Sequence, residues 1–120
     1  MLAPVHPPQA MLALSRGDVV TVALQGDLGK PRPALVIQSD LFDVHPSVTI
    51  LPITSELRDA PLFRIALRAG EVTGLARASQ VMVDKPQWIP REKIGSVCGR
   101  ADDETMLAVN RALAVFLGFA

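Results

Sequence analysis

The sequence predicts a mainly β protein, in which a small antiparallel barrel is capped by one amphipathic helix. Six short segments rich in apolar and β-branched residues follow one another between residues 18 and 98. The connections between them contain glycine, proline, aspartate and serine, which tight turns favour. Helical periodicity appears in the last segment, residues 102–117. Short strands in succession, with no helix between them, are typical of antiparallel sheets and small barrels.

The predicted strands are residues 18–24, 34–38, 48–53, 62–67, 77–84 and 94–98. Residues 18–24 (DVVTVAL) are rich in β-branched side chains, which favour strands. Residues 34–38 begin with a continuous apolar run, as expected for a strand that is buried on both faces. Residues 62–67 alternate large apolar side chains with Arg64 and Ala66, which is the period of a strand.

Residues 102–117 are the predicted helix. Its apolar residues recur at helical spacing, at Met106, Val109, Leu113, Phe116 and Leu117. Asp102 is a favourable N-cap, and Asp103 and Glu104 suit the positive end of the helix dipole. Gly118 stands where a glycine commonly ends a helix. We expect the apolar stripe to pack over the open end of the barrel.

The composition limits the classes of partner. The 120 residues suffice for one domain, and 49% hydrophobic and 20% charged residues are ordinary for a soluble globular protein. Twelve basic and twelve acidic side chains cancel. This balance argues against bulk electrostatic binding to nucleic acid, so any nucleic-acid contact has to be a local site.

The sequence gives no support for a metal, a cofactor or a membrane. Cys98 is the single cysteine, and His6 and His45 are the two histidines, so no Cys/His cluster has zinc-site spacing. No apolar run approaches the roughly 20 residues that a membrane span requires. We therefore expect no metal, no cofactor and a cytoplasmic location.

Residues 1–14 are expected to form a disordered leader before a folded domain at residues 15–120. The leader contains Pro4, Pro7 and Pro8 and no basic residue before Arg16. These features do not fit a secretory signal peptide, which has a positive start and an uninterrupted apolar run. Met11 is an alternative start of the chain.

Polar side chains stand at the edges of two predicted strands. Arg32 leads into the apolar run at 34–38, between two prolines that stiffen the backbone. Thr54 and Ser55 directly follow the strand at 48–53. A planar guanidinium binds phosphate oxygens in a bidentate manner. Together with two hydroxyls, it could bind or cleave a phosphodiester without a metal.

These positions belong to a longer series of short segments. The series comprises residues 16–20 (RGDVV), 32–36 (RPALV), 52–55 (PITS), 79–84 (SQVMVD), 93–95 (KIG) and 116–118 (FLG). In this order and at these separations they resemble the MazF/PemK family of bacterial toxin ribonucleases. The resemblance covers residues 15–119.

The resemblance implies an SH3-like barrel of the CcdB/MazF type, a homodimer and a cognate antitoxin as partner. It also implies cleavage of single-stranded RNA, such as messenger RNA, at a short motif without a metal. The ribose 2′-OH would attack the adjacent phosphorus and give a 2′,3′-cyclic phosphate and a 5′-hydroxyl end. By resemblance Arg32 would stabilise transition-state charge or protonate the leaving oxygen. Thr54 would orient the scissile phosphate, assisted by Ser55.

The resemblance also marks Arg77, Ser79 and Gln80 as RNA-binding residues, with one departure. Some members carry, two residues after the arginine, an aspartate proposed to act as the base. Serine is a poor general base at neutral pH, so that role is vacant at Ser79. Asp84 and Asp40 are the candidates to replace it, and the sequence does not decide between them.

Two other features bear on substrate binding. The loop at residues 25–30, which borders the RNA site in the family, is shorter than in many members. The sequence therefore does not decide which RNA motif is cleaved. Trp88 lies in a proline-flanked segment. An aromatic side chain can stack on unpaired bases, but in such a segment Trp88 is expected to pack as a hydrophobic lid, and in a homodimer it could equally line a partner-binding groove.

Two alternative functions remain. The same fold hosts toxins that bind DNA gyrase and cleave nothing, but these end in Trp-Gly-Ile, whereas this chain ends with residues 118–120 (GFA). The other alternative is an inactive module that only binds an antitoxin, which the vacant acid position at Ser79 keeps open.

Overall fold

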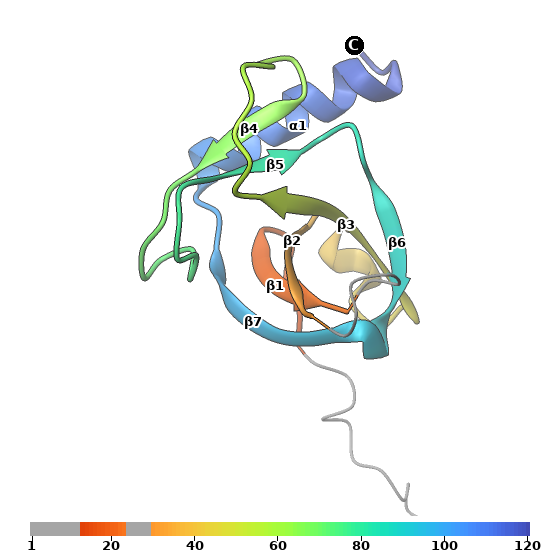
Figure 1. Cartoon of the computed structure of the whole chain (residues 1–120). Coiled ribbons are helices and arrows are strands. Elements are labelled where there is room, and N and C mark those ends of the chain that lie inside the picture. The colour runs from red at the N-terminus through yellow and green to blue at the C-terminus, as the bar shows by residue number, and fades with distance from the viewer. Residues whose placement is uncertain (1–12, 24–29) are drawn as a thin grey trace, which may run out of the picture.

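The computed structural model describes residues 13–23 and 30–120 of the 120-residue chain. Most of the expected leader at residues 1–14 and of the loop at 25–30 lies outside the described residues. In chain order the elements are β1 (Asp18–Val22), β2 (Arg32–Val36), the 3₁₀ turn η2 (Asp40–Phe42), β3 (Ser47–Thr54), β4 (Arg64–Leu67), β5 (Ser79–Met82), β6 (Gln87–Pro90), the 3₁₀ turn η3 (Arg91–Lys93), β7 (Ile94–Arg100) and α1 (Asp103–Leu117) (Figure 1).

The strands form one curved antiparallel sheet in the order β4-β5-β3-β2-β1-β7, and β6 pairs with β3 beside this path. β3 joins the parts of the sheet because it pairs with β2, β5 and β6. In the described residues β4 and β7, at the two ends of the path, do not pair with each other, so the sheet is barrel-like but not closed (Figure 1). The predicted class, mainly β with a C-terminal helix, is confirmed.

Strand β6 was missed by the sequence analysis because prolines flank it. Proline lacks a backbone N–H and is tolerated at strand ends and edges, and Pro90 is the last residue of β6. β6 lies along β3 with Ile89 opposite Val48 and Trp88 opposite Thr49. Alternation along the strand buries Ile89 and leaves Trp88 71% exposed. The expectation that Trp88 packs as a lid is therefore wrong for this chain.

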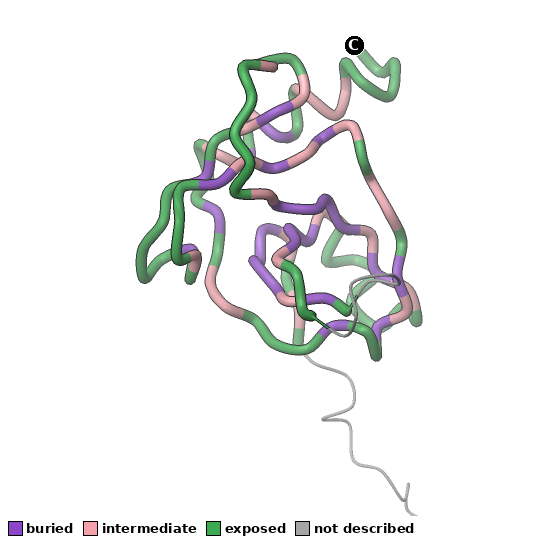
Figure 2. The backbone as a smooth tube through the Cα atoms, viewed as in Figure 1, coloured by how far each residue is buried: buried purple, intermediate pink, exposed green. Residues whose placement is uncertain are grey.

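The sheet is buried on both faces along β1, β2 and β3. Val19, Leu35 and Leu51 belong to a core cluster that includes Met106 and Val109 of α1. Their strand neighbours point the other way, so that Val20, Ala34 and Ile50, for example, form a second cluster inside the curved sheet. The prediction of a strand buried on both faces at 34–38 is confirmed for Ala34, Leu35 and Val36 (Figure 2).

Helix α1 has the predicted ends. The Asp102 carboxylate accepts a hydrogen bond from the Thr105 N–H at 2.8 Å, and Gly118 adopts a left-handed conformation with φ of 85°. Met106 and Val109 are buried, but Phe116 and Leu117 are each 49% exposed. The apolar stripe therefore packs against the core as far as Leu113, which is partly buried, and the last turn extends past the strands (Figures 1 and 2). No helix in the described residues is long and apolar enough to cross a membrane.

Candidate functional site

The ends of three neighbouring strands meet at one cavity. Ala34 pairs with Pro52, so the antiparallel register brings the start of β2 beside the end of β3. On the other side of β3, Thr54 pairs with Gln80, which brings the start of β5 to the same place. The resulting strand-end cavity measures about 330 Å³. It is lined by Arg32, Pro33, Ile53, Thr54, Ser55, Glu56, Leu75, Ala76, Arg77 and Ser79.

Arg32 and Thr54 lie in this cavity as the sequence predicted. Arg32 is the first residue of β2 and is exposed, so its charged group remains near solvent. Thr54 ends β3 and is half-buried, and its Oγ1 accepts a hydrogen bond from the Glu56 N–H at 3.0 Å. Because this contact uses a lone pair of the hydroxyl, the hydroxyl proton can still be donated to a ligand. Ser55, between Thr54 and Glu56 in the chain, is exposed.

Arg77 and Ser79 also line the cavity, but they differ in what they offer. Ser79 is 6% exposed, and its Oγ donates a hydrogen bond to the Arg77 carbonyl oxygen at 2.8 Å. This bond fixes the backbone just before β5. The exposed Arg77 side chain can then present a second guanidinium to an anionic ligand.

Gln80 takes a different position from the one expected. It does not line the cavity. Its side-chain amide instead makes hydrogen bonds to the segment after β3. The amide donates to the Arg58 carbonyl at 2.9 Å and accepts from the Arg58 N–H at 3.0 Å. It also accepts from Nη1 of the buried Arg64 at 2.9 Å. Gln80 thus holds the chain beside the cavity in place through these hydrogen bonds. Its expected contact with RNA stays a prediction.

Glu56 is the residue that the sequence analysis missed. It supplies the only carboxylate among the described residues that line the strand-end cavity. The signal was present in the sequence, since Glu56 follows Thr54 and Ser55 directly at the end of a strand.

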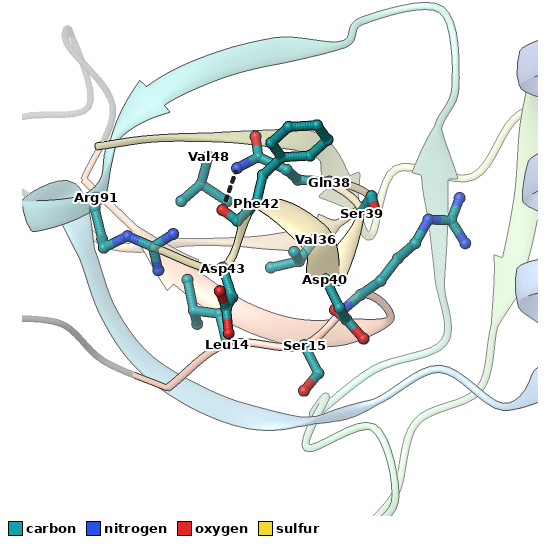
Figure 3. Close-up of a pocket in the computed structure, with 11 residues that line it drawn as sticks. Leu14, Ser15, Val36, Gln38, Ser39, Asp40, Phe42, Asp43, Val48 and Arg91 are labelled. Atoms are coloured by element: carbon teal, nitrogen blue, oxygen red, sulfur yellow. Dashed lines mark hydrogen bonds between the residues drawn. The ribbon is translucent and has the colours of Figure 1, made fainter. Parts of the chain in front are cut away.

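The two acids proposed to replace Ser79 do not line this cavity. Asp40 accepts a hydrogen bond from the Arg16 N–H at 2.7 Å and lines another cavity, shown in Figure 3. The Asp84 carboxylate lies 3.8 Å from the Lys85 ammonium, and its buried Oδ1 has no hydrogen-bond partner among the described residues. Neither position supports the role of base in the strand-end cavity.

Two other cavities are less suited to chemistry. The cavity of Figure 3 holds the buried Arg91, whose Nε donates to the His45 carbonyl, but its volume of about 10 Å³ admits no more than a water molecule. A groove of about 690 Å³ lies between β4, the following loop and α1. It contains Arg68 and Arg100 together with Glu71, Asp102 and Glu104. Three carboxylates against two guanidinium groups make it less suited to a phosphodiester, and the hydroxyl of Thr73 in its lining already donates to the Arg68 carbonyl.

In the described residues no group of three or more His, Cys, Asp or Glu side chains could hold a metal ion. One carboxyl group has a shifted pKa, and it lies at the cap of α1, away from the strand-end cavity. There the hydrogen bonds from Thr105 lower the pKa of the Asp102 carboxyl below its ordinary value.

Comparison with known proteins gives a consistent result. A family model described as PemK-like, MazF-like toxin of type II toxin-antitoxin system matches residues 15–117. The probable endoribonuclease MazF of Mycolicibacterium smegmatis is 44% identical over 108 residues, which are 89% of this chain and 99% of that protein.

Solved structures agree with the fold. A mycobacterial endoribonuclease in complex with its cognate antitoxin superimposes with a TM-score of 0.74 at 24% identity, covering 90% of this chain and 98% of that one. The Mycobacterium tuberculosis toxin MazF-mt6 gives 0.73 at 25% identity, covering 84% and 96%.

Proposed function

The chain belongs to the PemK/MazF family of toxins of type II toxin–antitoxin systems, and from this premise we propose that it is a metal-independent endoribonuclease acting on single-stranded RNA. The observation that carries the proposal is the strand-end cavity, where Arg32, Thr54 and Arg77 lie together. Two guanidinium groups and a hydroxyl whose proton is available suit a phosphodiester. The neutral charge balance of the chain fits a local site of this kind.

In the proposed reaction the ribose 2′-OH attacks the adjacent phosphorus. The products are a 2′,3′-cyclic phosphate and a 5′-hydroxyl end. Thr54 Oγ1 donates its proton to a phosphate oxygen, because its lone pair already accepts from the Glu56 N–H. Arg32 stabilises the charge that builds up on phosphorus or protonates the leaving oxygen, and preorganised donors of this kind often supply the largest catalytic effect. Ser55 and Arg77 hold the neighbouring phosphate and ribose.

The natural substrate in this proposal is messenger RNA, cut at a short motif in the cytoplasm. We also propose that the chain forms a homodimer and is inhibited by a cognate antitoxin, as the complex of the mycobacterial endoribonuclease supports. An antitoxin segment that covers the strand-end cavity would exclude RNA from it.

The test is cleavage of a long RNA of little secondary structure by the purified chain in excess EDTA, with mapping of the end groups. We expect cuts at a short recurring motif that leave 5′-hydroxyl ends. Arg32→Ala is expected to abolish the cuts while the thermal unfolding temperature stays near that of the wild type. Arg111→Ala, on the exposed side of α1, is the matched control and should cleave normally.

Other outcomes would overturn the proposal in distinct ways. Intact RNA together with inhibited DNA gyrase would indicate a gyrase poison of the same fold. Intact RNA together with antitoxin binding alone would indicate an inactive binding module. Full cleavage by a folded Arg32→Ala variant would refute the site while leaving the activity in place.

A further inference from the structure

The acid position of the family motif is Ser79, but the strand-end cavity still contains a carboxylate. Ser79 is a poor replacement for a carboxylate base, because a neutral hydroxyl accepts a proton only weakly at neutral pH, and its Oγ donates a hydrogen bond to the Arg77 carbonyl. Glu56 lines the same cavity as Arg32 and Thr54 and is exposed. Its carboxylate makes no hydrogen bond or ion pair within the part of the chain that the structure describes. It is therefore available to a ligand.

The backbone of Glu56 is held on both sides. Its N–H donates to Thr54 Oγ1 at 3.0 Å, and its carbonyl accepts from Arg64 Nη1 at 3.0 Å. Arg64 is only 9% exposed, and the same Nη1 is bonded to the Gln80 amide oxygen. A buried guanidinium needs hydrogen-bond partners. This contact therefore holds the backbone at Glu56, two residues after the end of β3. The backbone from which the Glu56 side chain extends is thus tied to the Thr54 hydroxyl.

We propose that Glu56 is the general base of the ribonuclease reaction, an inference that rests on the proposed function. Its carboxylate takes the proton of the ribose 2′-OH while the 2′ oxygen forms a bond to phosphorus. The bond between phosphorus and the 5′ oxygen breaks, and that oxygen takes a proton from Arg32 or from water. Glu56 then gives its proton to solvent, and the group that protonated the leaving oxygen, Arg32 or water, takes one back from solvent. No oxidant, metal or further reactant is needed.

The charges around Glu56 are compatible with this role. Among the described residues of the lining, one carboxylate lies in the same cavity as two guanidinium groups, those of Arg32 and Arg77. A base has to come within about 3 Å of the proton that it removes. Glu56 and Thr54, which would hold the phosphate, line the same cavity and are two residues apart in the chain, so the carboxylate is within side-chain reach of a phosphodiester bound there.

The first test is the Glu56→Gln variant, which keeps the shape and removes the charge. General-base catalysis contributes roughly 10²–10⁴-fold, and kcat is expected to fall within that range while KM stays equal or decreases. For the wild type we expect kcat to decrease towards acid pH, as it does for reactions that need a general base, and the variant should lack this decrease. Glu92→Gln, on an exposed turn away from the cavity, is the matched control with wild-type kcat and pH profile.

A second variant separates chemistry from folding. The structural contacts of Glu56 run through its backbone, so Glu56→Ala should unfold at nearly the wild-type temperature. Added formate, a small carboxylate, is expected to restore part of its kcat in proportion to concentration. A structural role would not produce such rescue.

The outcomes for the two proposals can be distinguished. If the wild-type chain cleaves RNA in EDTA and Glu56→Gln keeps full kcat with an unchanged pH profile, Glu56 is not the base, while the ribonuclease proposal stands. Higher kcat in Glu56→Gln would likewise overturn the inference, since the charge would then only repel RNA. A wild-type chain that leaves RNA intact would overturn both proposals.

Discussion

At the scale of single residues, the Thr54 hydroxyl combines a structural role with a proposed chemical one. Its oxygen accepts a hydrogen bond from the Glu56 N–H, and in the proposed reaction its proton is donated to the phosphate. The first role shapes the chain after β3, and the second is chemical. Substitutions that differ in only one of these properties separate them.

Thr54→Val keeps the branched shape and removes the hydroxyl. The loss of one preorganised donor typically lowers kcat by about 10²–10³-fold, and we expect a decrease of that order. Loss of one partly exposed hydrogen bond costs about 1 kcal/mol of stability, so the fold should persist. Thr54→Ser retains the hydroxyl and should keep most of the activity. Equal cleavage rates for the two variants, measured under single-turnover conditions, would contradict the role given to Thr54.

At the scale of elements, the cap of α1 carries a pH-dependent contribution to stability. Hydrogen bonds from Thr105 to the Asp102 carboxylate lower its pKa in the folded state. A group whose folded pKa is depressed stabilises the fold above its unfolded pKa, which is about 4 for aspartate. This contribution is lost as the pH falls through the folded pKa.

Asp102→Ala should therefore lower Tm at pH 7, and the difference from the wild type should shrink below about pH 4. The measurement is thermal unfolding followed by circular dichroism between pH 2.5 and pH 8. Asp103→Ala, one residue later, leaves the cap in place and is expected to show a smaller effect. A Tm difference that stays constant across this pH range would refute the account of the cap.

Particular elements show how far the sequence could lead. The ends of α1 were predictable because Asp102 and Gly118 act through local backbone geometry. The proximity of Arg32 and Thr54 was predictable, because consecutive antiparallel strands place the start of β2 beside the end of β3. Three features depended on contacts distant in the sequence: β6 pairing with β3, the exposure of Phe116 and Leu117, and the use of Gln80 by Arg58 and Arg64. No local pattern encodes such contacts.

At the scale of the whole molecule, the balance of charge limits how the chain meets RNA. Twelve basic and twelve acidic side chains leave a formal net charge of zero. Long-range attraction of a polyanion is then weak, and the cavity guanidinium groups have to supply most of the electrostatic affinity. The salt dependence of binding measures how many phosphates they contact.

With Arg32 and Arg77 as the phosphate ligands, about two contacts at a slope of about −0.7 each give a slope near −1.4 for log K against log salt. The measurement is fluorescence anisotropy of an RNA oligonucleotide that carries a 2′-deoxyribose at the cleaved position and so cannot react. Arg77→Gln should reduce the slope by about 0.7, because one contact is lost, and Arg111→Gln should leave it unchanged. A wild-type slope steeper than about −4 would mean six or more contacts. In that case a wider basic surface, and not the strand-end cavity, would dominate RNA binding.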